Sequence, residues 1–329
     1  MSKVRLLLKR KRRAGVNAGQ YCTFCTALSS QQIDAAPSCQ ACYNFPAQRA
    51  TLFSPTDITM SLLRRTLKYT TGNRLGQRLL QKQMRLCRWL MGIGAGAPVG
   101  TSGEVEIMQM LARSNRRDLV IVDAGANTGQ FLNMSVDRLG DRLSEIHSFE
   151  PAAETFEALA NNAPQRSGVV LNNLALGSAA GQTELFYDRE RSGLASMTRR
   201  DLSCFGTAFD KSETIQVTTL DQYAAENAIT QIDWLKIDVE GHELDVLRGA
   251  EDLLQAGAID HVTFEFGGCH IDTRTFFRDF YQFFSAHGMR ILRITPSGFL
   301  SPIKQYRESE ENFDTSNFLA VSKDRSLAA

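Results

Sequence analysis

The residues with the clearest chemical meaning form a glycine-rich turn, Asp123-Ala124-Gly125-Ala126-Asn127-Thr128-Gly129. The apolar run 119–122 precedes the turn, and Phe131, Leu132 and Val136 follow it at helical spacing. This pattern predicts a strand, a tight turn and the N-terminus of a helix. Such a turn presents backbone N–H groups and the positive end of the helix dipole to a ligand.

The turn lacks glycines that the dinucleotide-binding fingerprint requires. Counted from Gly125, the pattern Gly-x-Gly-x-x-Gly needs glycine at positions 127 and 130, where the chain has Asn127 and Gln130. Close approach of the backbone to a pyrophosphate is therefore excluded. An acid at the strand end followed by Gly-x-x-x-Gly suits a ligand with an amine, a carboxylate and a ribose, and S-adenosylmethionine is such a ligand. The alternative is an ordinary strand-to-helix turn.

Acidic residues recur at the ends of the predicted strands. Glu150 follows the run 146–149, and Asp238 and Glu240 follow the run 234–237. In open parallel sheets the ligand crevice lies outside the carboxyl ends of the strands. An unpaired buried acid is costly, so core packing alone does not explain the repeated placement. We therefore expect these acids to surround one ligand site, with Glu150 accepting hydrogen bonds from both ribose hydroxyls.

Alternating apolar runs and helical stretches predict a mostly parallel sheet with helices on both faces. The expected strands are near 119–123, 145–149, 168–172, 233–237, 261–265, 289–294 and 317–321, with short β segments at 183–187 and 214–218. The expected helices are near 128–139, 152–163, 242–255 and 273–287.

Residues 119–323 resemble the FkbM family of S-adenosylmethionine-dependent methyltransferases. The matching segments are VIVDAGANTG (120–129), SFEP (148–151), NLALGS (173–178), VTTLDQY (217–223), LKIDVEGHELDVLRGA (235–250) and NFLAV (317–321). The resemblance implies a Rossmann-like class I methyltransferase fold with a seven-stranded sheet whose last strand is antiparallel. It also implies S-adenosylmethionine as the donor and a hydroxyl of a sugar, polyketide or other small-molecule or glycan as the acceptor.

The candidate site residues follow from these segments. We expect the cofactor to be bound by Asp123, Gly125, Asn127, Gly129, Glu150, Asn173 and Asp238. A neutral hydroxyl is a weak nucleophile, so a general base is expected, with Asp238, His270 and Glu240 as catalytic candidates and Asp238 or His270 preferred. Glu240 can instead brace the glycine turn. Asp238, Glu240 and Glu265 can also hold Mg²⁺, although their spacing does not require it.

The acceptor side is expected in the loop 189–196, whose serine and glycine content suits a lid. Arg199 and Arg200 follow this loop and can hold an acidic group of the acceptor. A plain surface loop with solvated charges explains the same residues.

Upstream lie two Cys-x2-Cys pairs separated by thirteen residues, Cys22 with Cys25 and Cys39 with Cys42. Four thiolates in two such pairs match a tetrahedral structural zinc site. Disulfides, an iron–sulfur cluster or four unrelated cysteines are the alternatives. The remaining cysteines, Cys87, Cys204 and Cys269, are isolated, and we expect them to be buried.

Charge divides the chain near residue 100. Residues 1–100 carry 16 Lys and Arg but only Asp34 and Asp57, a net charge of +14, whereas residues 101–329 have a net charge of −13. A basic half can bind nucleic acid, an anionic lipid or an anionic acceptor. We favour the alternative that it docks on the acidic half or remains a solvated tail. Residues 57–92 are predicted to be helical, with Leu75, Leu79, Leu86 and Leu90 on one face and basic residues elsewhere. Such a helix can lie on a membrane or contact nucleic acid, but more often it docks on protein.

These features predict a basic tail (1–17), a zinc-ribbon-like module (18–50), a helical linker (57–92) and a methyltransferase domain (103–325). With 43% hydrophobic and 22% charged residues and no apolar run near the roughly 20 residues that span a bilayer, a cytoplasmic enzyme without a transmembrane segment is expected. The alternatives are an RNA methyltransferase that uses the basic half, which we do not favour, and a non-catalytic zinc-module interaction protein. The oligomeric state is left open.

Overall fold

The computed structural model describes residues 64, 67–96, 103–113 and 116–322. The chain divides into two units, residues 1–65 and residues 66–329, and nearly all described residues belong to the second. The predicted basic tail, the zinc-ribbon-like module and its four cysteines lie outside the described residues. None of the helices in the described part of the chain combines the length and the hydropathy needed to cross a bilayer.

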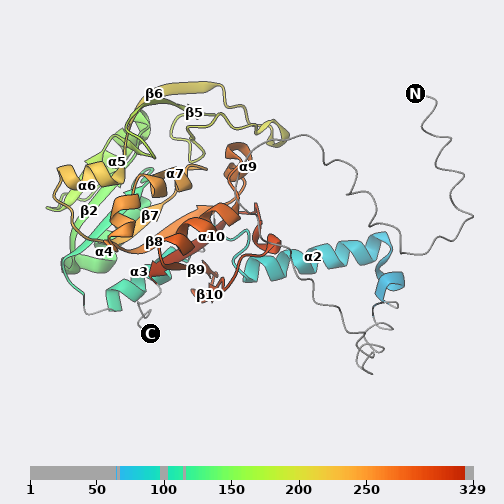
Figure 1. The fold of residues 1–329 in the computed structure, drawn as a ribbon. Helices are drawn as coiled ribbons and strands as arrows, with labels where there is room; N and C mark the ends of the chain where they lie inside the picture. Colours follow the sequence, from blue (N-terminus) through green and yellow to red (C-terminus); the bar gives the residue numbers. More distant parts are fainter. Residues whose placement is uncertain (1–63, 65–66, 97–102, 114–115, 323–329) are drawn as a thin grey trace, which may run out of the picture. The chain divides into compact units, whose positions relative to one another are not determined.

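A central sheet of eight strands has the order β10-β9-β11-β8-β7-β1-β2-β3. Strands β1, β2, β3, β7 and β8 pair in parallel, whereas β11 is antiparallel to both β8 and β9 (Figure 1). The bounds are β1 (Leu119–Ala124), β2 (Leu143–Phe149), β3 (Val169–Asn172), β7 (Ile232–Ile237), β8 (Ile259–Phe266), β9 (Met289–Ile294), β10 (Leu300–Pro302) and β11 (Ser316–Ser322). This is a Rossmann-like, mainly parallel arrangement.

The prediction of seven strands is wrong by one. The additional strand is β10, which pairs antiparallel with β9 at the edge of the sheet, from Leu300 opposite Ile294 to Pro302 opposite Leu292. Three residues that include a proline give no alternating pattern, and proline is tolerated at an edge because it need not donate to a neighbouring strand.

Helices cover both faces of the sheet (Figure 1). On one face, α3 (Glu104–Arg113), α4 (Gln130–Leu139) and α5 (Ala153–Asn162) contribute to a core that contains Trp234 of β7. On the other, α6 (Leu220–Glu226), α7 (Glu243–Arg248), α8 (Glu251–Gln255) and α10 (Phe277–Ala286) pack around Leu235 and Phe264. All six residues of β7 are buried, as expected for a central parallel strand.

Two expected helices are divided. The helix predicted over 242–255 breaks into α7 and α8 around Gly249, where the backbone of Gly177 comes so close that a Cβ atom on Gly249 would lie 2.0 Å from the carbonyl oxygen of Gly177. The helix predicted over 273–287 starts later, as α10, and is preceded by the short α9 (Cys269–Thr273). Both interruptions occur where another segment approaches the helix.

A second sheet has the order β4-β6-β5, with β4 (Ala175–Leu176), β5 (Gly181–Tyr187) and β6 (Lys211–Thr218). Strands β5 and β6 are antiparallel and confirm the two predicted β segments. Between them runs the long loop predicted to form the acceptor side. The short 3-10 helices are η1 (Gly140–Arg142), η2 (Ser203–Phe205) and η3 (Glu308–Glu310).

Helix α2 (Arg74–Leu90) is the described part of the predicted helical linker. The side chain of Asn73 caps its start by accepting a hydrogen bond from the N–H of Gly76 at 2.8 Å. None of its residues is buried, and Cys87 on this helix is exposed, as is Cys204 in η2. The expectation that these two cysteines are buried is therefore wrong, whereas Cys269 is buried.

Candidate active site

Two adjoining cavities open at the carboxyl ends of β1, β7 and β8. The larger has a volume of about 960 Å³ and the smaller about 90 Å³. The residues that line both cavities are Gly125, Asn127, Gly193, Asp238 and Glu240. The glycine turn and the carboxylates after β7 thus lie where one cavity leads into the other, the crevice position expected for this kind of sheet.

The glycine turn is held tightly against the segment that follows β7. Gly125 has a φ of 84°, and a Cβ atom there would lie 1.8 Å from the carbonyl oxygen of Asp238. The N–H of Asp238 donates to the carbonyl oxygen of Ala124 at 2.9 Å, and Gly125 N–H donates to that of Phe149 at 3.0 Å. Glycine is needed here for conformation and for space, because a side chain would push the two turns apart.

Glu150 lines the smaller cavity and is already bound to backbone groups. Its Oε2 accepts from the N–H of Asn127 at 3.0 Å, and its Oε1 accepts from the N–H of Ala152 at 3.0 Å. Burial raises the pKa of Glu150 to about 7, and these two hydrogen bonds oppose the rise. Each carboxylate oxygen has a second lone pair, so the group can still accept hydrogen bonds from a ligand.

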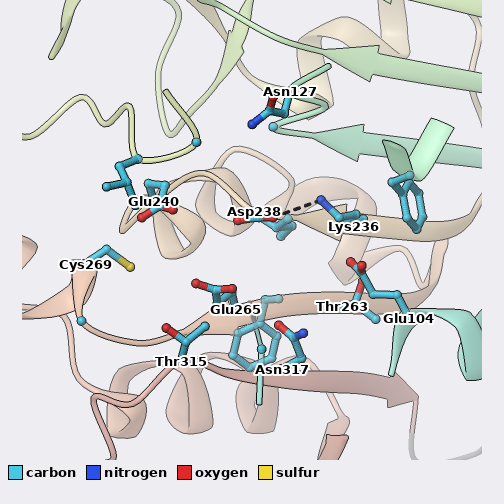
Figure 2. A pocket seen from close by; sticks show the side chains of 18 of the residues that line it. Glu104, Asn127, Lys236, Asp238, Glu240, Thr263, Glu265, Cys269, Thr315 and Asn317 are labelled. Atoms are coloured by element: carbon cyan, nitrogen blue, oxygen red, sulfur yellow. Dashed lines mark hydrogen bonds and ion pairs between the residues drawn. The ribbon is translucent and has the colours of Figure 1, made fainter. Parts of the chain in front are cut away.

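Lys236 lies between two carboxylates. Its Nζ is 3.5 Å from Oδ1 of Asp123 and 3.4 Å from Oδ2 of Asp238 (Figure 2). Burial disfavours the charged lysine, but Asp238, Asp123 and Glu104 raise its pKa above the usual range. Asp123 is fully buried, and burial raises its pKa against the opposing effect of Lys236.

Three carboxylates gather at the junction of the cavities. Oxygens of Asp238, Glu240 and Glu265 lie within 4.8 Å of one another, and Figure 2 shows their side chains facing the same space. Burial raises the pKa of Glu240 to about 8, with a further rise from Asp238 against the opposing effect of Arg200. Burial and the neighbouring acids likewise raise the pKa of Glu265 well above its usual range. Glu240 and Glu265 therefore hold a proton more tightly than isolated carboxylates do.

The charge state of Glu240 should make stability depend on pH. Because its pKa in the folded protein is about 8 against an ordinary 4.5, the folded state holds the proton more tightly, and stability is lost as pH rises through this window. We expect Glu240→Gln to reduce this pH-dependent decrease in the free energy of unfolding by up to about 1.4 kcal/mol per pH unit, the limit for one titrating proton. Urea unfolding at several pH values between 5 and 8 measures this effect. The control Glu184→Gln, at an exposed position of β5, should leave the slope unchanged, and a slope equal to wild type in Glu240→Gln would contradict the assignment.

The loop between β5 and β6 closes over this junction. Ser196 Oγ donates to the carbonyl oxygen of Glu240 at 2.7 Å. Arg200 donates from Nη1 to Oε2 of Glu240 at 2.7 Å, and its Nε lies 3.5 Å from Oδ2 of Asp272. Arg199 donates to the carbonyl oxygen of Phe209 and does not line either cavity. Arg200 is thus already paired with two carboxylates, and it orients Glu240 instead of presenting a free cation.

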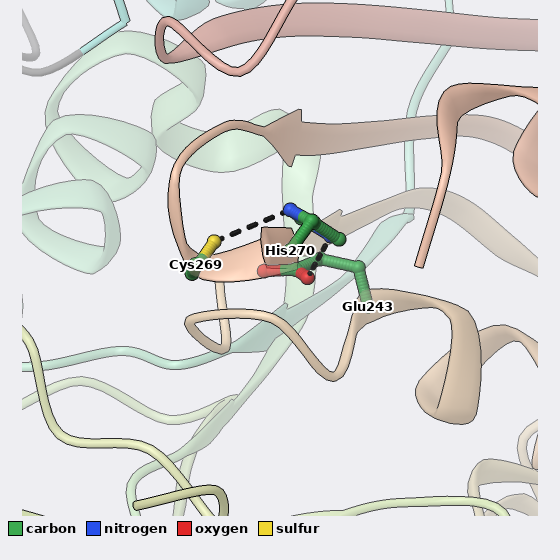
Figure 3. Close-up of side chains that lie close together, drawn as sticks. All are labelled: Glu243, Cys269 and His270. Carbon is green, nitrogen blue, oxygen red and sulfur yellow. Dashed lines mark hydrogen bonds and ion pairs between the residues drawn. The ribbon is translucent and has the colours of Figure 1, made fainter. Parts of the chain in front are cut away.

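His270, a predicted catalytic residue, lies outside the cavity lining. Its ring is fully buried, with Nε2 at 2.8 Å from Oε2 of Glu243 and Nδ1 at 3.2 Å from Sγ of Cys269 (Figure 3). Glu243 in turn accepts from the N–H groups of Val239 and Gly241. Burial disfavours its charge, but His270 and these backbone groups lower the pKa of Glu243 below its usual value. This pair therefore holds the turn after β7 and does not reach the acceptor.

The structure brings together part of the predicted cofactor set. Gly125, Asn127, Glu150 and Asp238 line the cavities. Asp123, Gly129 and Asn173 do not: Asp123 lies behind Lys236, Gly129 caps α4, and Asn173 donates to the carbonyl oxygens of Glu150 and Pro151. These three residues contact or belong to the turns that carry the cavity-lining residues.

Sequence reasoning missed several residues that line the larger cavity, among them Glu104, Thr263, Thr315 and Asn317 (Figure 2). Asn317 pairs with Glu265 across β11 and β8. Because β11 is antiparallel, its first residues lie at the same edge as the last residues of β8. The NFLAV segment was visible in the sequence, but only the strand direction places Asn317 at the site.

Comparison with known proteins identifies the domain. The profile of the Methyltransferase FkbM domain matches residues 123–291. A hexuronic acid methyltransferase, AglP, from Haloferax volcanii is 28% identical over 155 residues, which cover 47% of this chain and 59% of that protein. Methyltransferase 1 from Beauveria bassiana is 30% identical over 150 residues, 41% of this chain and 59% of that protein.

The chain thus spans somewhat more than half the length of these two relatives. A solved structure of a methyltransferase FkbM from Methylobacillus flagellatus KT is also similar, with 15% identity and a TM-score of 0.40 over 63% of this chain and 45% of that one. Because the domain profile covers more than half of the 329 residues, the chain belongs to the FkbM family of methyltransferases.

Proposed function

We propose that the protein transfers a methyl group from S-adenosylmethionine to a hydroxyl oxygen of a sugar, polyketide or other small-molecule or glycan acceptor. The observation that carries the proposal is the junction of the two cavities, where Asp238 and Glu240 line both. A donor that extends from the smaller cavity into the larger one would meet an acceptor beside these carboxylates.

The lining of the smaller cavity suits the adenine end of the donor, and its volume of about 90 Å³ leaves the rest of the donor to the larger cavity. The lining of the smaller cavity combines one buried carboxylate, Glu150, with the apolar side chains of Phe149, Leu174, Leu176 and Leu185. Apolar side chains suit the faces of an adenine, and Glu150 retains lone pairs for ribose hydroxyls. When bound, S-adenosylmethionine supplies an electrophilic methyl group, so the protein has to position the acceptor, exclude water and remove a proton.

Glu240 is the group that we propose as general base, with Asp238 the alternative. A base works best when its pKa lies near the working pH, and the pKa of Glu240 is about 8. Its Oε2 is held by Arg200, and the side chain borders both cavities. His270 is buried against Glu243 and lines neither cavity, so we propose that it is a positioning residue that holds the turn after β7. We expect Glu240→Gln to lower kcat by roughly 10²–10⁴-fold, the usual contribution of a general base.

The charge of the larger cavity bears on the acceptor. Among the described residues, its lining contains Glu104, Asp238, Glu240, Glu265 and Asp314 against Lys236, Arg189 and Arg200. An excess of acids suits the positively charged donor and a neutral hydroxyl acceptor better than an RNA backbone. Lys236 and Arg200 already neutralise part of the carboxylate cluster, which does not favour Mg²⁺. The name of the Haloferax relative supports a sugar-type acceptor.

Donor binding is tested by calorimetry with S-adenosylhomocysteine. We expect Glu150→Gln to weaken binding about 10-fold or more, because hydrogen bonds to a charged acceptor contribute roughly 1.5–3 kcal/mol. The control Glu157→Gln, at an exposed position of α5, should bind as wild type. Absence of binding to the wild-type protein would refute the proposal. Transfer of labelled methyl to a panel of neutral sugars and uronic acids then identifies the acceptor class.

A further inference from the structure

Helix α2 has an apolar face that no described part of the chain covers. Leu75, Leu79, Leu86 and Leu90 follow one another at spacings of four, seven and four residues, which places them on one side of a helix. They are 68%, 61%, 58% and 57% exposed, and α2 contributes no buried residue. Four exposed leucines on one face mark an interaction surface.

The side of α2 next to the leucines is basic. Arg74, Arg78, Lys82 and Arg85 lie along it at spacings of four, four and three residues, and the helix contains no acid. Within the described residues none of these four has an ion pair. Arg88 differs, because it pairs with Asp314 at 2.8 Å and donates to Asn312 at 3.1 Å, which fastens the end of the helix to the domain.

The residues after α2 lead directly to the larger cavity. The N–H of Gly94 donates to the carbonyl oxygen of Thr315 at 3.0 Å, and Gly94 and Gly96 line the cavity. Gly92 packs so closely that a Cβ atom on it would lie 2.2 Å from the carbonyl oxygen of Ile294. Ile93 is buried between these glycines. Whatever binds α2 is therefore held close to the cavity.

We propose that α2 lies on the surface of an anionic lipid bilayer, with its leucines among the acyl chains and its basic side chains at the headgroups. Charge complementarity favours an anionic bilayer as the occupant. The four cations flank the apolar face, and α2 contains no acid that could pair with a basic partner. An apolar face of leucines bordered by cationic side chains is typical of helices that lie in the membrane interface. Trp89 follows Arg85 by one turn and is 42% exposed, a placement suited to the headgroup region.

The two tryptophans of the chain provide the measurement. Trp234 is fully buried in the core, so a change in emission on adding vesicles reports Trp89. With the full-length protein and vesicles of phosphatidylcholine containing phosphatidylglycerol, we expect a blue shift and protection from acrylamide. Both effects should be weak with phosphatidylcholine alone and should decline with added salt. The variant Trp89→Phe should lose the shift while still sedimenting with the vesicles.

A matched pair of substitutions tests the apolar face. Leu79→Glu should lower partitioning into anionic vesicles roughly 10-fold, the lower end of what burial of a leucine contributes. Phe299→Glu adds the same charge at an exposed position outside α2 and should change partitioning less than about 2-fold, the small effect expected of one charge.

The absence of a Trp89 shift with anionic vesicles would overturn the proposal, and so would equal partitioning of Leu79→Glu and wild type. Sedimentation of the wild-type protein without a shift would assign binding to residues outside α2 and would likewise overturn it. A Trp89 already shielded from acrylamide before vesicles are added would also overturn it, because the face would then be covered by the chain itself or a second copy. The test needs no methyl transfer, so its outcome is independent of the proposed function.

Discussion

Replacing His270 by leucine is expected to destabilise the domain by about 1.5–3 kcal/mol, the contribution of a hydrogen bond to a buried charged group. Glu243 is fully buried, and its carboxylate lies 2.8 Å from His270 Nε2. Without the imidazole, the hydrogen bonds from Val239 and Gly241 would have to hold the charge alone. Urea unfolding at pH 7 measures the difference in the free energy of unfolding.

A thermodynamic cycle separates the pair from the packing of the ring. In the double variant His270→Leu with Glu243→Leu no unpaired charge remains, so the loss should be clearly smaller than the sum of the two single losses. Additive losses would show that the contact between His270 and Glu243 contributes little. A His270→Leu protein as stable as wild type would show that Glu243 takes up a proton or reaches water.

The sequence already indicated the parts of the site that local patterns determine. The strand, glycine turn and helix around Gly125 follow from neighbouring residues, and so does the placement of Asp238 and Glu240 after the predicted strand 233–237. The FkbM resemblance added the cofactor and acceptor class as expectations. These predictions depend on contacts between residues close in the sequence and on one general property of parallel sheets.

The role of His270 could not be predicted in the same way. The sequence shows two glycines, a cysteine and a histidine after a strand, which suits a loop over the crevice. In the structure, the chain turns inward as α9, and the imidazole lies against Glu243 and Phe266. Whether a loop residue faces the cavity or the core depends on packing between distant segments, and one sequence carries no direct signal for it.

Glu150 and Asn317 show two other limits. Glu150 is at the predicted place, but its carboxylate also accepts hydrogen bonds from two backbone N–H groups, which gives it a structural task besides any contact with a ligand. Asn317 reaches the cavity because β11 is inserted antiparallel beside β8. Strand order and direction arise from the whole sheet, so residues contributed by the last strand were absent from the predicted site.

Gly125→Ala is expected to have the largest effect on the cofactor site. The substitution meets two obstacles: a φ of 84°, which costs a side chain roughly 1–2 kcal/mol, and a Cβ position 1.8 Å from the carbonyl oxygen of Asp238. Relief of the clash requires β1 and β7 to separate at the point where Asp238 N–H donates to Ala124. We expect a loss of about 2–5 kcal/mol in stability, which combines the conformational cost with that of overpacking.

The matched control is Gly288→Ala, in the turn between α10 and β9. Gly288 also has a positive φ, 68°, but a Cβ atom there would meet nothing within 4 Å. It should therefore show only the conformational cost, about 1–2 kcal/mol. Affinity for S-adenosylhomocysteine, measured by calorimetry on folded protein, should fall at least 100-fold in Gly125→Ala and stay unchanged in Gly288→Ala. Equal stability losses with retained binding would mean that the two turns can separate without disturbing the cofactor. The close contact of Gly125 with Asp238 would then limit neither folding nor cofactor binding.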